Sequence, residues 1–161
     1  MPERTFTDPA TWFASLPGVV VAAGGLITDP AGRVLLVKPN YRDHWTIPGG
    51  ICEHGEPPQD GAARELAEEL GLTIPVGRLL AADWSQPYGL AARPILHFVF
   101  DGGELADGAG IVVQEEELDG FGFVTPADLA AHLPPYGLSR VNGALRARTA
   151  GSTLFLPHES R

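Results

Sequence analysis

A loop followed by a short acidic helix, at residues 49–72, constrains the fold of this sequence more than any other stretch. Pro57 and Pro58 suit the start of a helix, because proline lacks an N–H group that the first turn leaves unpaired. Gly71 suits its end, because glycine readily adopts the left-handed conformation that closes a helix. We therefore predict a helix between these prolines and Gly71. The apolar stripe that this helix can bury consists of Ala62, Leu66 and Leu70.

Three glutamates share another face of the predicted helix, at positions i, i+3 and i+4: Glu65, Glu68 and Glu69. Like charges at i,i+4 destabilise a helix by roughly 0.2–0.5 kcal/mol per pair, and the last turn already carries the negative end of the helix dipole. Arg64 offsets only part of this charge. Mg²⁺ prefers carboxylate oxygens and usually keeps waters and substrate phosphates as its other ligands. The spacing alone leaves two interpretations open, a divalent metal site and a solvated acidic face.

Gly50, Glu56 and residues 64–72 (Arg-Glu-Leu-Ala-Glu-Glu-Leu-Gly-Leu) resemble the Nudix box in every fixed position. Residues 45–50 (Trp-Thr-Ile-Pro-Gly-Gly) look like the strand and turn that usually lead into that box. The sequence is therefore identified as a member of the Nudix (MutT-like) hydrolase family, with its box at residues 50–72. The resemblance implies an α/β fold, the Nudix α/β/α sandwich with a mixed β-sheet.

The resemblance also implies a reaction and a set of residue roles. Most members use Mg²⁺, which Mn²⁺ can replace, to hydrolyse the pyrophosphate bond of a nucleoside diphosphate linked to a group X. The products are a nucleoside monophosphate and phosphorylated X. The metal ligands carried over by position are Gly49 (through its backbone carbonyl), Glu65, Glu68 and Glu69. Glu65 is also the first choice for the general base, whereas Arg64 orients the glutamates and Glu56 supports them.

A further acidic residue outside the box is expected near the metal. Octahedral coordination of Mg²⁺ needs ligands beyond one helix face, and water, substrate or another segment can supply them. The run Glu115-Glu116-Glu117 precedes a predicted strand, and the resemblance places a functional glutamate in this loop. Counting back from the aromatic Phe123, the family pattern puts that glutamate at Glu117. Glu115, Glu116 and a solvated loop without any ligand stay open as alternatives.

Four residues are predicted to contact the substrate: Lys38, Arg42, Trp84 and Tyr88. The two cations flank the loop that leads into the box, where a phosphate contact and plain solvated charge are both open. The two aromatic residues can stack on a base, since every base offers a π-face, or can serve as core residues at a strand end. Residues 85–88 resemble parts of the signatures of NADH, ADP-ribose and diadenosine polyphosphate hydrolases, so the sequence indicates no single one of these substrates.

The remaining composition bounds the class of protein. A length of 161 residues with 44% apolar residues gives room for one domain with a sizeable core. We expect residues 1–17 to form an N-terminal extension and residues 18–161 a single Nudix domain. A net charge of −9 disfavours binding to polymeric nucleic acid, which needs a basic surface. The apolar run 19–27 is too short to span a membrane and the first residues lack a signal pattern, so we expect a cytoplasmic protein with a small nucleotide substrate. A homodimer is left open.

The intact box and the position of the single cysteine bear on two alternatives to this assignment. A non-catalytic Nudix domain that senses a ligand or regulates a partner commonly has a damaged box, whereas this box is intact. Isopentenyl-diphosphate isomerase, another Nudix enzyme, needs a catalytic cysteine, and Cys52 is wrongly placed for that role. The sequence therefore predicts a pyrophosphohydrolase.

Periodicity and turn residues predict the other elements in outline. We expect strands at 19–28, 33–38, 74–84, 93–100, 121–124 and 153–156, with a turn at 101–103. Thr125 and Pro126 suit the N-cap and first position of a further helix. A last helix is expected at 138–149. A solvated face is the default for its arginines (Arg140, Arg146 and Arg148), and a phosphate contact is the alternative.

Overall fold

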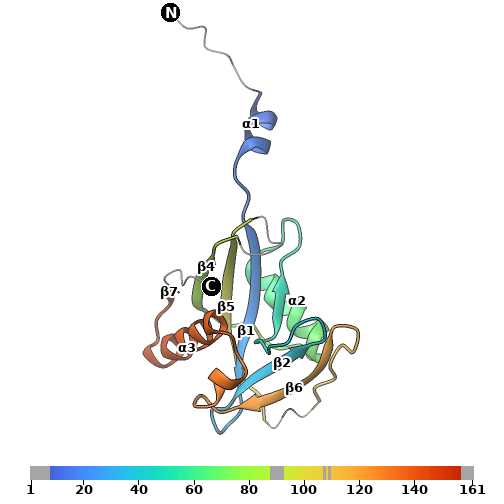
Figure 1. Ribbon diagram of the computed structural model, residues 1–161, viewed down its shortest axis with the longest axis vertical. Helices are drawn as coiled ribbons and strands as arrows, with labels where there is room; N and C mark the ends of the chain where they lie inside the picture. Colours follow the sequence, from blue (N-terminus) through green and yellow to red (C-terminus); the bar gives the residue numbers. More distant parts are fainter. Residues whose placement is uncertain (1–7, 88–92, 107, 109, 157–161) are drawn as a thin grey trace, which may run out of the picture.

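A mixed seven-stranded sheet forms the middle layer of the protein, with one helix packed on each face (Figure 1). The computed structural model describes residues 8–87, 93–106, 108 and 110–156. The strands are β1 (Val20–Thr28), β2 (Val34–Pro39), β3 (Gly49–Ile51), β4 (Leu79–Ser85), β5 (Ile95–Glu104), β6 (Leu118–Val124) and β7 (Leu154–Leu156). The helices are α1 (Pro9–Ser15), α2 (Pro58–Leu70) and α3 (Pro135–Ala150), with a 3-10 turn at Leu129–Ala131. The predicted α/β fold with a mixed sheet is confirmed.

The strand order explains where the sheet opens. The order is β6-β2-β1-β5-β4-β7, with parallel pairing in β1–β5 and β4–β7. β2 pairs with β1 only at its far end, Thr28 opposite Val34. The first half of β1 instead pairs with β3, at Ala22–Gly24. β1 and β2 therefore diverge, and the short strand β3 carries the start of the box into the opening between them.

Alternation along the strands divides the core into two layers. Leu26 and Ile27 are neighbours on β1 and point to opposite faces, and both are fully buried. Leu26 packs in the cluster that includes Val141 of α3, whereas Ile27 packs in the cluster that includes Leu66 of α2. The predicted apolar stripe of the box helix is thus the buried face of α2.

The ends of α2 follow the local sequence signals. Pro57 occupies the N-cap and Pro58 the first turn, as predicted. Gly71 has φ 66° and donates its N–H to the carbonyl of Ala67 at 3.0 Å. The left-handed conformation at this position favours glycine, so the helix ends where the sequence predicts.

Three predicted element boundaries are wrong. β5 does not turn at residues 101–103 but continues to Glu104, because Asp101 and Glu104 still pair with β1. No α-helix begins at Thr125; its hydroxyl donates to Asp128 at 2.7 Å in a turn that leads into the 3-10 segment. In both places pairing or turn contacts override a local preference. The strand predicted at 74–84 begins only at Leu79.

The solvated arginine face predicted for the last helix is also largely wrong. Arg140 is buried, Arg148 is half-buried, and only Arg146 is exposed. Arg148 donates to the backbone carbonyl of Leu26, and to Asp101 at 2.7 Å. This arginine therefore links α3 to the sheet instead of facing solvent.

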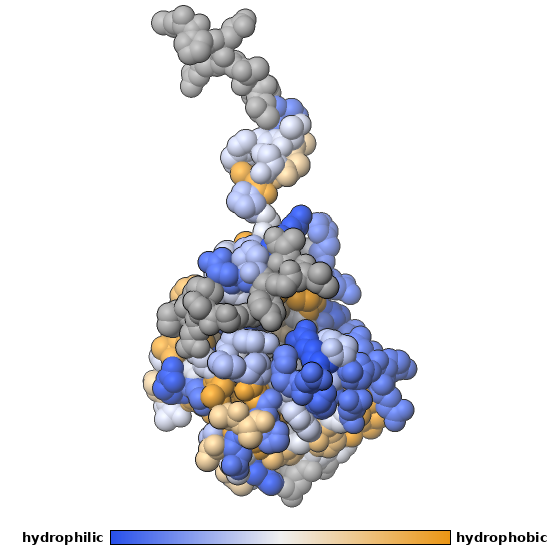
Figure 2. Space-filling model, in the orientation of Figure 1, coloured by the Kyte–Doolittle hydropathy of each residue, from blue (hydrophilic) through white to orange (hydrophobic). Residues whose placement is uncertain are grey.

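The helix α1 stands away from the sheet and buries none of its residues (Figure 1). Its rings of Trp12 and Phe13 pack on each other, with centroids 4.9 Å apart, and both side chains stay exposed. In Figure 2 this helix stands above the body and shows pale and orange residues side by side. The division into an extension and a domain stays a prediction. Within the described ranges, no helix combines the length and apolar character needed to cross a bilayer.

Candidate active site

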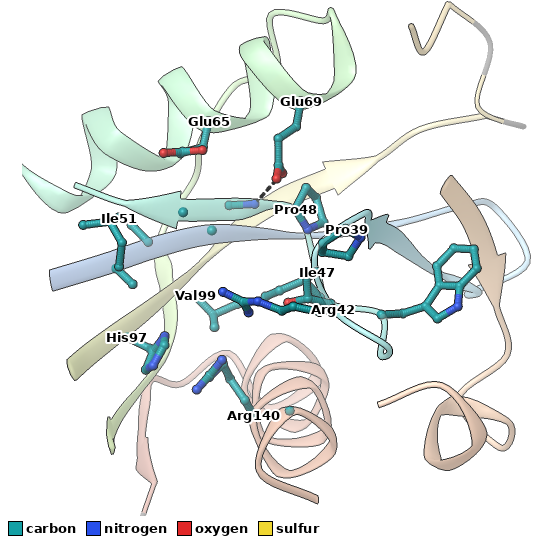
Figure 3. Close-up of a pocket in the computed structure, with 18 of the residues that line it drawn as sticks. Pro39, Arg42, Ile47, Pro48, Ile51, Glu65, Glu69, His97, Val99 and Arg140 are labelled. Atoms are coloured by element: carbon teal, nitrogen blue, oxygen red, sulfur yellow. Dashed lines mark hydrogen bonds between the residues drawn. The ribbon is translucent and has the colours of Figure 1, made fainter. Parts of the chain in front are cut away.

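A cleft of about 530 Å³ opens where β1 and β2 diverge (Figure 3). Its walls come from β1, β3, β5, α2, the loop 39–48 and the beginning of α3. On the α2 side lie two carboxylates of the box, Glu65 and Glu69. On the α3 side lie His97 and Arg140, and Arg42 projects into the space between the two sides. The cleft is thus acidic at one end and carries arginine at the other.

Glu69 is the most deeply placed acid of the box, with 6% of its surface exposed. It points from α2 toward β3 and accepts the N–H of Gly49 at 2.7 Å (Figure 3). Burial raises the pKa of Glu69 to about 8; the nearby carboxylates of Glu65, Glu117 and Glu68 act in the same direction, and the Gly49 hydrogen bond opposes them. The site therefore holds a carboxyl group that lacks a compensating cation.

Glycine is required at the two positions where β3 approaches the acids. A Cβ atom on Gly50 would lie 2.6 Å from the carboxylate of Glu65. Gly49 has φ 141°, and a Cβ there would lie 2.4 Å from the carbonyl oxygen of Ala23. Only glycine lets the strand pass this close to both the helix and β1.

Burial also raises the pKa of the Glu65 carboxyl group, whereas the hydrogen bond and the charge of Arg64 lower it.

Arg64 links the loop of the box to its helix. Its guanidinium donates to both carboxylate oxygens of Glu56, at 2.9 and 3.0 Å, and to the backbone carbonyl of Ile51. It also donates to Glu65 at 2.9 Å and to Glu68 at 3.0 Å. The hydrogen bonds from Arg64 and from the Glu53 N–H hold the pKa of Glu56 below its usual value. These contacts are compatible with an orienting role for Arg64, which stays a prediction.

Glu117 is the acidic residue outside the box that lines the same cleft. Its carboxylate raises the pKa of both Glu65 and Glu69, which places its charge near theirs. Its backbone carbonyl accepts the N–H of Asn40 at 2.9 Å, and this contact ties the acidic loop to the end of β2. Glu115 and Glu116 are exposed and do not line the cleft. The position predicted for Glu117 is therefore compatible with a metal ligand, although that role stays a prediction.

The predicted substrate contacts are distributed unevenly. Arg42 lines the cleft, with its guanidinium carbon 5.0 Å from the ring centroid of Tyr41. Lys38 does not line it; its ammonium group donates to the carbonyls of Pro39 and Arg42 and so holds the loop. Trp84 is a half-buried residue of β4 outside the cleft. Tyr88 lies outside the described residues. Among the predicted contacts that the structure describes, only Arg42 lines the cleft, and the substrate-binding roles stay predictions.

The carboxylates of the box are suitable ligands for a divalent cation, but their present orientation does not form a coordination site. Among the described residues, no three Asp, Glu, His or Cys side chains are already arranged around one point. Glu65 and Glu68 are turned to Arg64, and Glu69 to the Gly49 amide. Arg64 offsets only part of the negative charge of these acids, and a hard cation with oxygen ligands can neutralise the excess. Rotation of these side chains away from their present partners would expose that donor set.

One pair of charged residues in the cleft wall escaped the sequence analysis. Arg140 of α3 donates to both carboxylate oxygens of Asp83 on β4, each at 3.0 Å, and both residues are buried. The available signal was the aspartate itself, since it follows four apolar residues of a strand and a buried carboxylate needs a partner. The sequence around Asp83 does not indicate that its partner is Arg140, which lies 57 positions away.

Comparison with known proteins identifies the family of this chain. A family profile described as NUDIX domain matches residues 18–141. The chain belongs to the Nudix family. This confirms the resemblance of the box, and with it the prediction of a hydrolase that acts on pyrophosphate bonds.

The proteins that resemble this Nudix hydrolase carry names that denote different activities. A MutT-like protein from Streptomyces ambofaciens is 26% identical over 125 residues, 78% of this chain and 76% of that protein. Diphosphoinositol polyphosphate phosphohydrolase 2 from Rattus norvegicus is 50% identical over 54 residues, but the match covers only 33% of this chain and 30% of that protein. A solved UDP-X diphosphatase has a TM-score of 0.69 and 22% identity, with 89% of this chain and 69% of that chain covered. At that identity the structural likeness shows the fold alone.

Proposed function

We propose that this Nudix hydrolase cleaves the pyrophosphate bond of a small nucleoside diphosphate derivative in a reaction that depends on a divalent cation. The products are a nucleoside monophosphate and phosphorylated X. The observation that carries the proposal is the convergence of Glu65, Glu69 and Glu117 at one end of a single cleft. The mutual repulsion of the three carboxylates, with Glu69 buried, Glu65 half-buried and Glu117 exposed at the rim, makes this end a place for cations and for the phosphates that cations bring with them.

Mg²⁺, or Mn²⁺ in its place, would be held by Glu65, Glu69 and the backbone carbonyl of Gly49, with Glu68 and Glu117 completing the donor set. When bound, the ion neutralises phosphate charge and lowers the pKa of a water molecule. Glu68 is the most solvated of these, with 52% of its side chain exposed, so it would contribute from the rim.

The chain's own residues supply orientation and proton transfer. A general base should have a pKa near the working pH, and burial moves the pKa of Glu65 upward, in that direction. Arg64 fixes the Glu65 carboxylate at 2.9 Å and supports the loop through Glu56. Arg42 is exposed in the cleft and can donate to phosphate oxygens in a bidentate manner.

The size and charge of the protein support a small substrate. A cleft of about 530 Å³ lies within the range of roughly 300–1,000 Å³ typical of small-ligand sites. Nine of the eleven lysines and arginines lie in the described part, and six of these nine donate hydrogen bonds to carboxylates or backbone carbonyls instead of forming a basic stripe. A polymeric nucleic acid would need such a stripe.

The test is a panel of nucleoside diphosphate derivatives, among them ADP-ribose, NADH and diadenosine polyphosphates, incubated with Mg²⁺ or Mn²⁺. Chromatography should resolve a nucleoside monophosphate and phosphorylated X as the first products. Glu65→Gln serves as the inactive control for contaminating enzymes. Glu53→Gln, a change of one exposed acid in the loop of the box, serves as the matched active control. Release of free base or inorganic phosphate as the primary product would refute the assignment.

A further inference from the structure

The buried ion pair of Asp83 and Arg140 is a feature that the proposed reaction does not use. Both side chains are nearly inaccessible, with 9% and 8% of their residue surface exposed. Burying such a pair carries a desolvation cost that apolar packing avoids, so stability alone is a weak reason for its presence. Arg140 nevertheless lines the cleft, on the wall opposite the acids (Figure 3). This placement suggests a role toward the substrate.

The ion pair of Asp83 and Arg140 has no net charge, but it still offers N–H donors of Arg140 that Asp83 does not bind. A guanidinium group has five N–H donors in a fixed planar fork. Asp83 accepts from Nε and from Nη2, and within the described part of the chain Arg140 makes no other hydrogen bond. The remaining N–H groups, on Nη1 and Nη2, lie on one edge of a group that Asp83 holds rigidly. Such an edge recognises two neighbouring acceptors better than it recognises an isolated negative charge.

The floor beside Arg140 is suited to a flat ring. On β1 the small residues Ala22 and Gly24 stand opposite His97 and Val99 of β5. All four line the cleft; the side chain of Ala22 is small, and the backbone of Pro48 and Gly49 packs against Gly24. Ile47 adds apolar surface from the loop. A nucleobase fits this wall better than a phosphate group, whose charge matches Arg42 and the cation end of the cleft.

We propose that Arg140, fixed by Asp83, is a specificity-determining residue that makes this cleft prefer keto bases, guanine above the others. Guanine presents O6 and N7 as two adjacent acceptors, which is the pattern that an arginine fork binds, and uracil presents O4. Adenine and cytosine place an amino donor at the equivalent position, where it meets the N–H groups of Arg140. The inference rests on the proposed function in one respect, that the cleft takes a nucleotide.

Four substrates that differ only in the base test this preference: GDP-glucose, UDP-glucose, ADP-glucose and CDP-glucose. We expect kcat/KM for GDP-glucose to exceed that for ADP-glucose by between about 5-fold and 150-fold, the range of one good bidentate base contact. UDP-glucose should exceed CDP-glucose in the same direction. Equal values, or a preference for the amino bases, would overturn the inference.

Substitutions test whether Arg140 and Asp83 cause the preference for GDP-glucose over ADP-glucose. Arg140→Lys keeps a cation beside Asp83 but loses the planar fork, so the ratio between GDP-glucose and ADP-glucose should fall to near parity. Arg146→Lys, an exposed position on the same helix, is the matched control and should keep the wild-type ratio. If Arg140→Lys does not fold, the double variant Asp83→Asn/Arg140→Gln replaces the ion pair with two neutral amides and should show the same loss. A wild-type ratio in a folded variant would overturn the role of Arg140.

Binding measurements separate this inference from the proposed reaction. Calorimetry with GDP and ADP, in the presence of Mg²⁺, reports base preference without any turnover. Tighter binding of GDP that disappears in Arg140→Lys, with no hydrolysis of these four substrates or of the panel used to test the proposed function, would retain the inference and refute the reaction. Hydrolysis of all four at similar rates, with equal binding of GDP and ADP, would refute the inference and retain the reaction.

Discussion

Replacing Glu69 with glutamine should stabilise the metal-free protein at alkaline pH while removing its activity. Burial raises the pKa of Glu69 from 4.5 to about 8, so the folded protein holds this proton more tightly than the unfolded chain does. The free energy of unfolding of the wild type therefore falls as the pH rises from about 4.5 to 8, and the loss is complete above that value. Glutamine keeps an acceptor for the Gly49 N–H at the same place but cannot ionise.

The size of the effect follows from the difference between the two pKa values. At 1.36 kcal/mol per pH unit, a rise from 4.5 to about 8 sets an upper limit of about 5 kcal/mol on the gain at pH 8 and above. Rotation of the neighbouring carboxylates toward solvent relieves part of the repulsion, so we expect a gain of about 1–3 kcal/mol. Near pH 4.5 the wild type and the variant should be equally stable.

Urea unfolding in the presence of a chelator, repeated from pH 4.5 to pH 9, measures this difference directly. Glu68→Gln is the control, because it removes the same charge from the same helix at a position where 52% of the side chain is exposed. Adding Mg²⁺ should stabilise the wild type and leave Glu69→Gln less affected. Parallel stability curves for the wild type and Glu69→Gln across the whole range would refute the account of Glu69 as an uncompensated buried acid.

Three further predictions concern the acidic end of the cleft. Excess chelator should abolish hydrolysis while circular dichroism shows the fold intact; full turnover under these conditions would exclude the metal-dependent mechanism. Gly50→Ala should lower kcat by more than about tenfold, because its Cβ would lie 2.6 Å from the Glu65 carboxylate and displace it; unchanged kinetics would show that this carboxylate is not the base. Glu117→Gln should lower both kcat and metal affinity whereas Glu115→Gln and Glu116→Gln leave them unchanged; the opposite pattern would move the ligand to a neighbour, and three silent variants would remove this loop from the site.

The features that the sequence predicts correctly are those specified by neighbours along the chain. The prolines and Gly71 define α2 because each acts through its own backbone geometry. The two strands predicted at 19–28 and 33–38 meet in a hairpin at Asp29–Gly32, in which the Asp29 carboxylate accepts the N–H groups of Ala31 and Arg33. These contacts span two to four residues, so composition and spacing determine them.

The wrong predictions involve partners far away in sequence. Asp101 looks like a turn residue, yet its register with Leu26 on β1 keeps it in β5. Arg140 looks like part of a solvated helix face, yet it meets Asp83, a residue 57 positions away. Strand pairing and ion pairing of this kind depend on the assembled sheet, and no local pattern specifies them.

The two ends of the cleft also differ in whether their residues are close together or far apart in the sequence. The acidic end is built mainly within the box, where Gly50 and Glu65 approach each other because strand and helix are joined by a short loop. The α3 end is built from β4, β5 and α3, so its chemistry depends on the tertiary fold, as the contact between Asp83 and Arg140 illustrates. Substitutions at the α3 end can therefore change which nucleotide is accepted without disturbing the carboxylates that act on the pyrophosphate. A box of fixed sequence can serve relatives with different substrates for this reason, and the base preference of this protein has to be sought in residues outside the box.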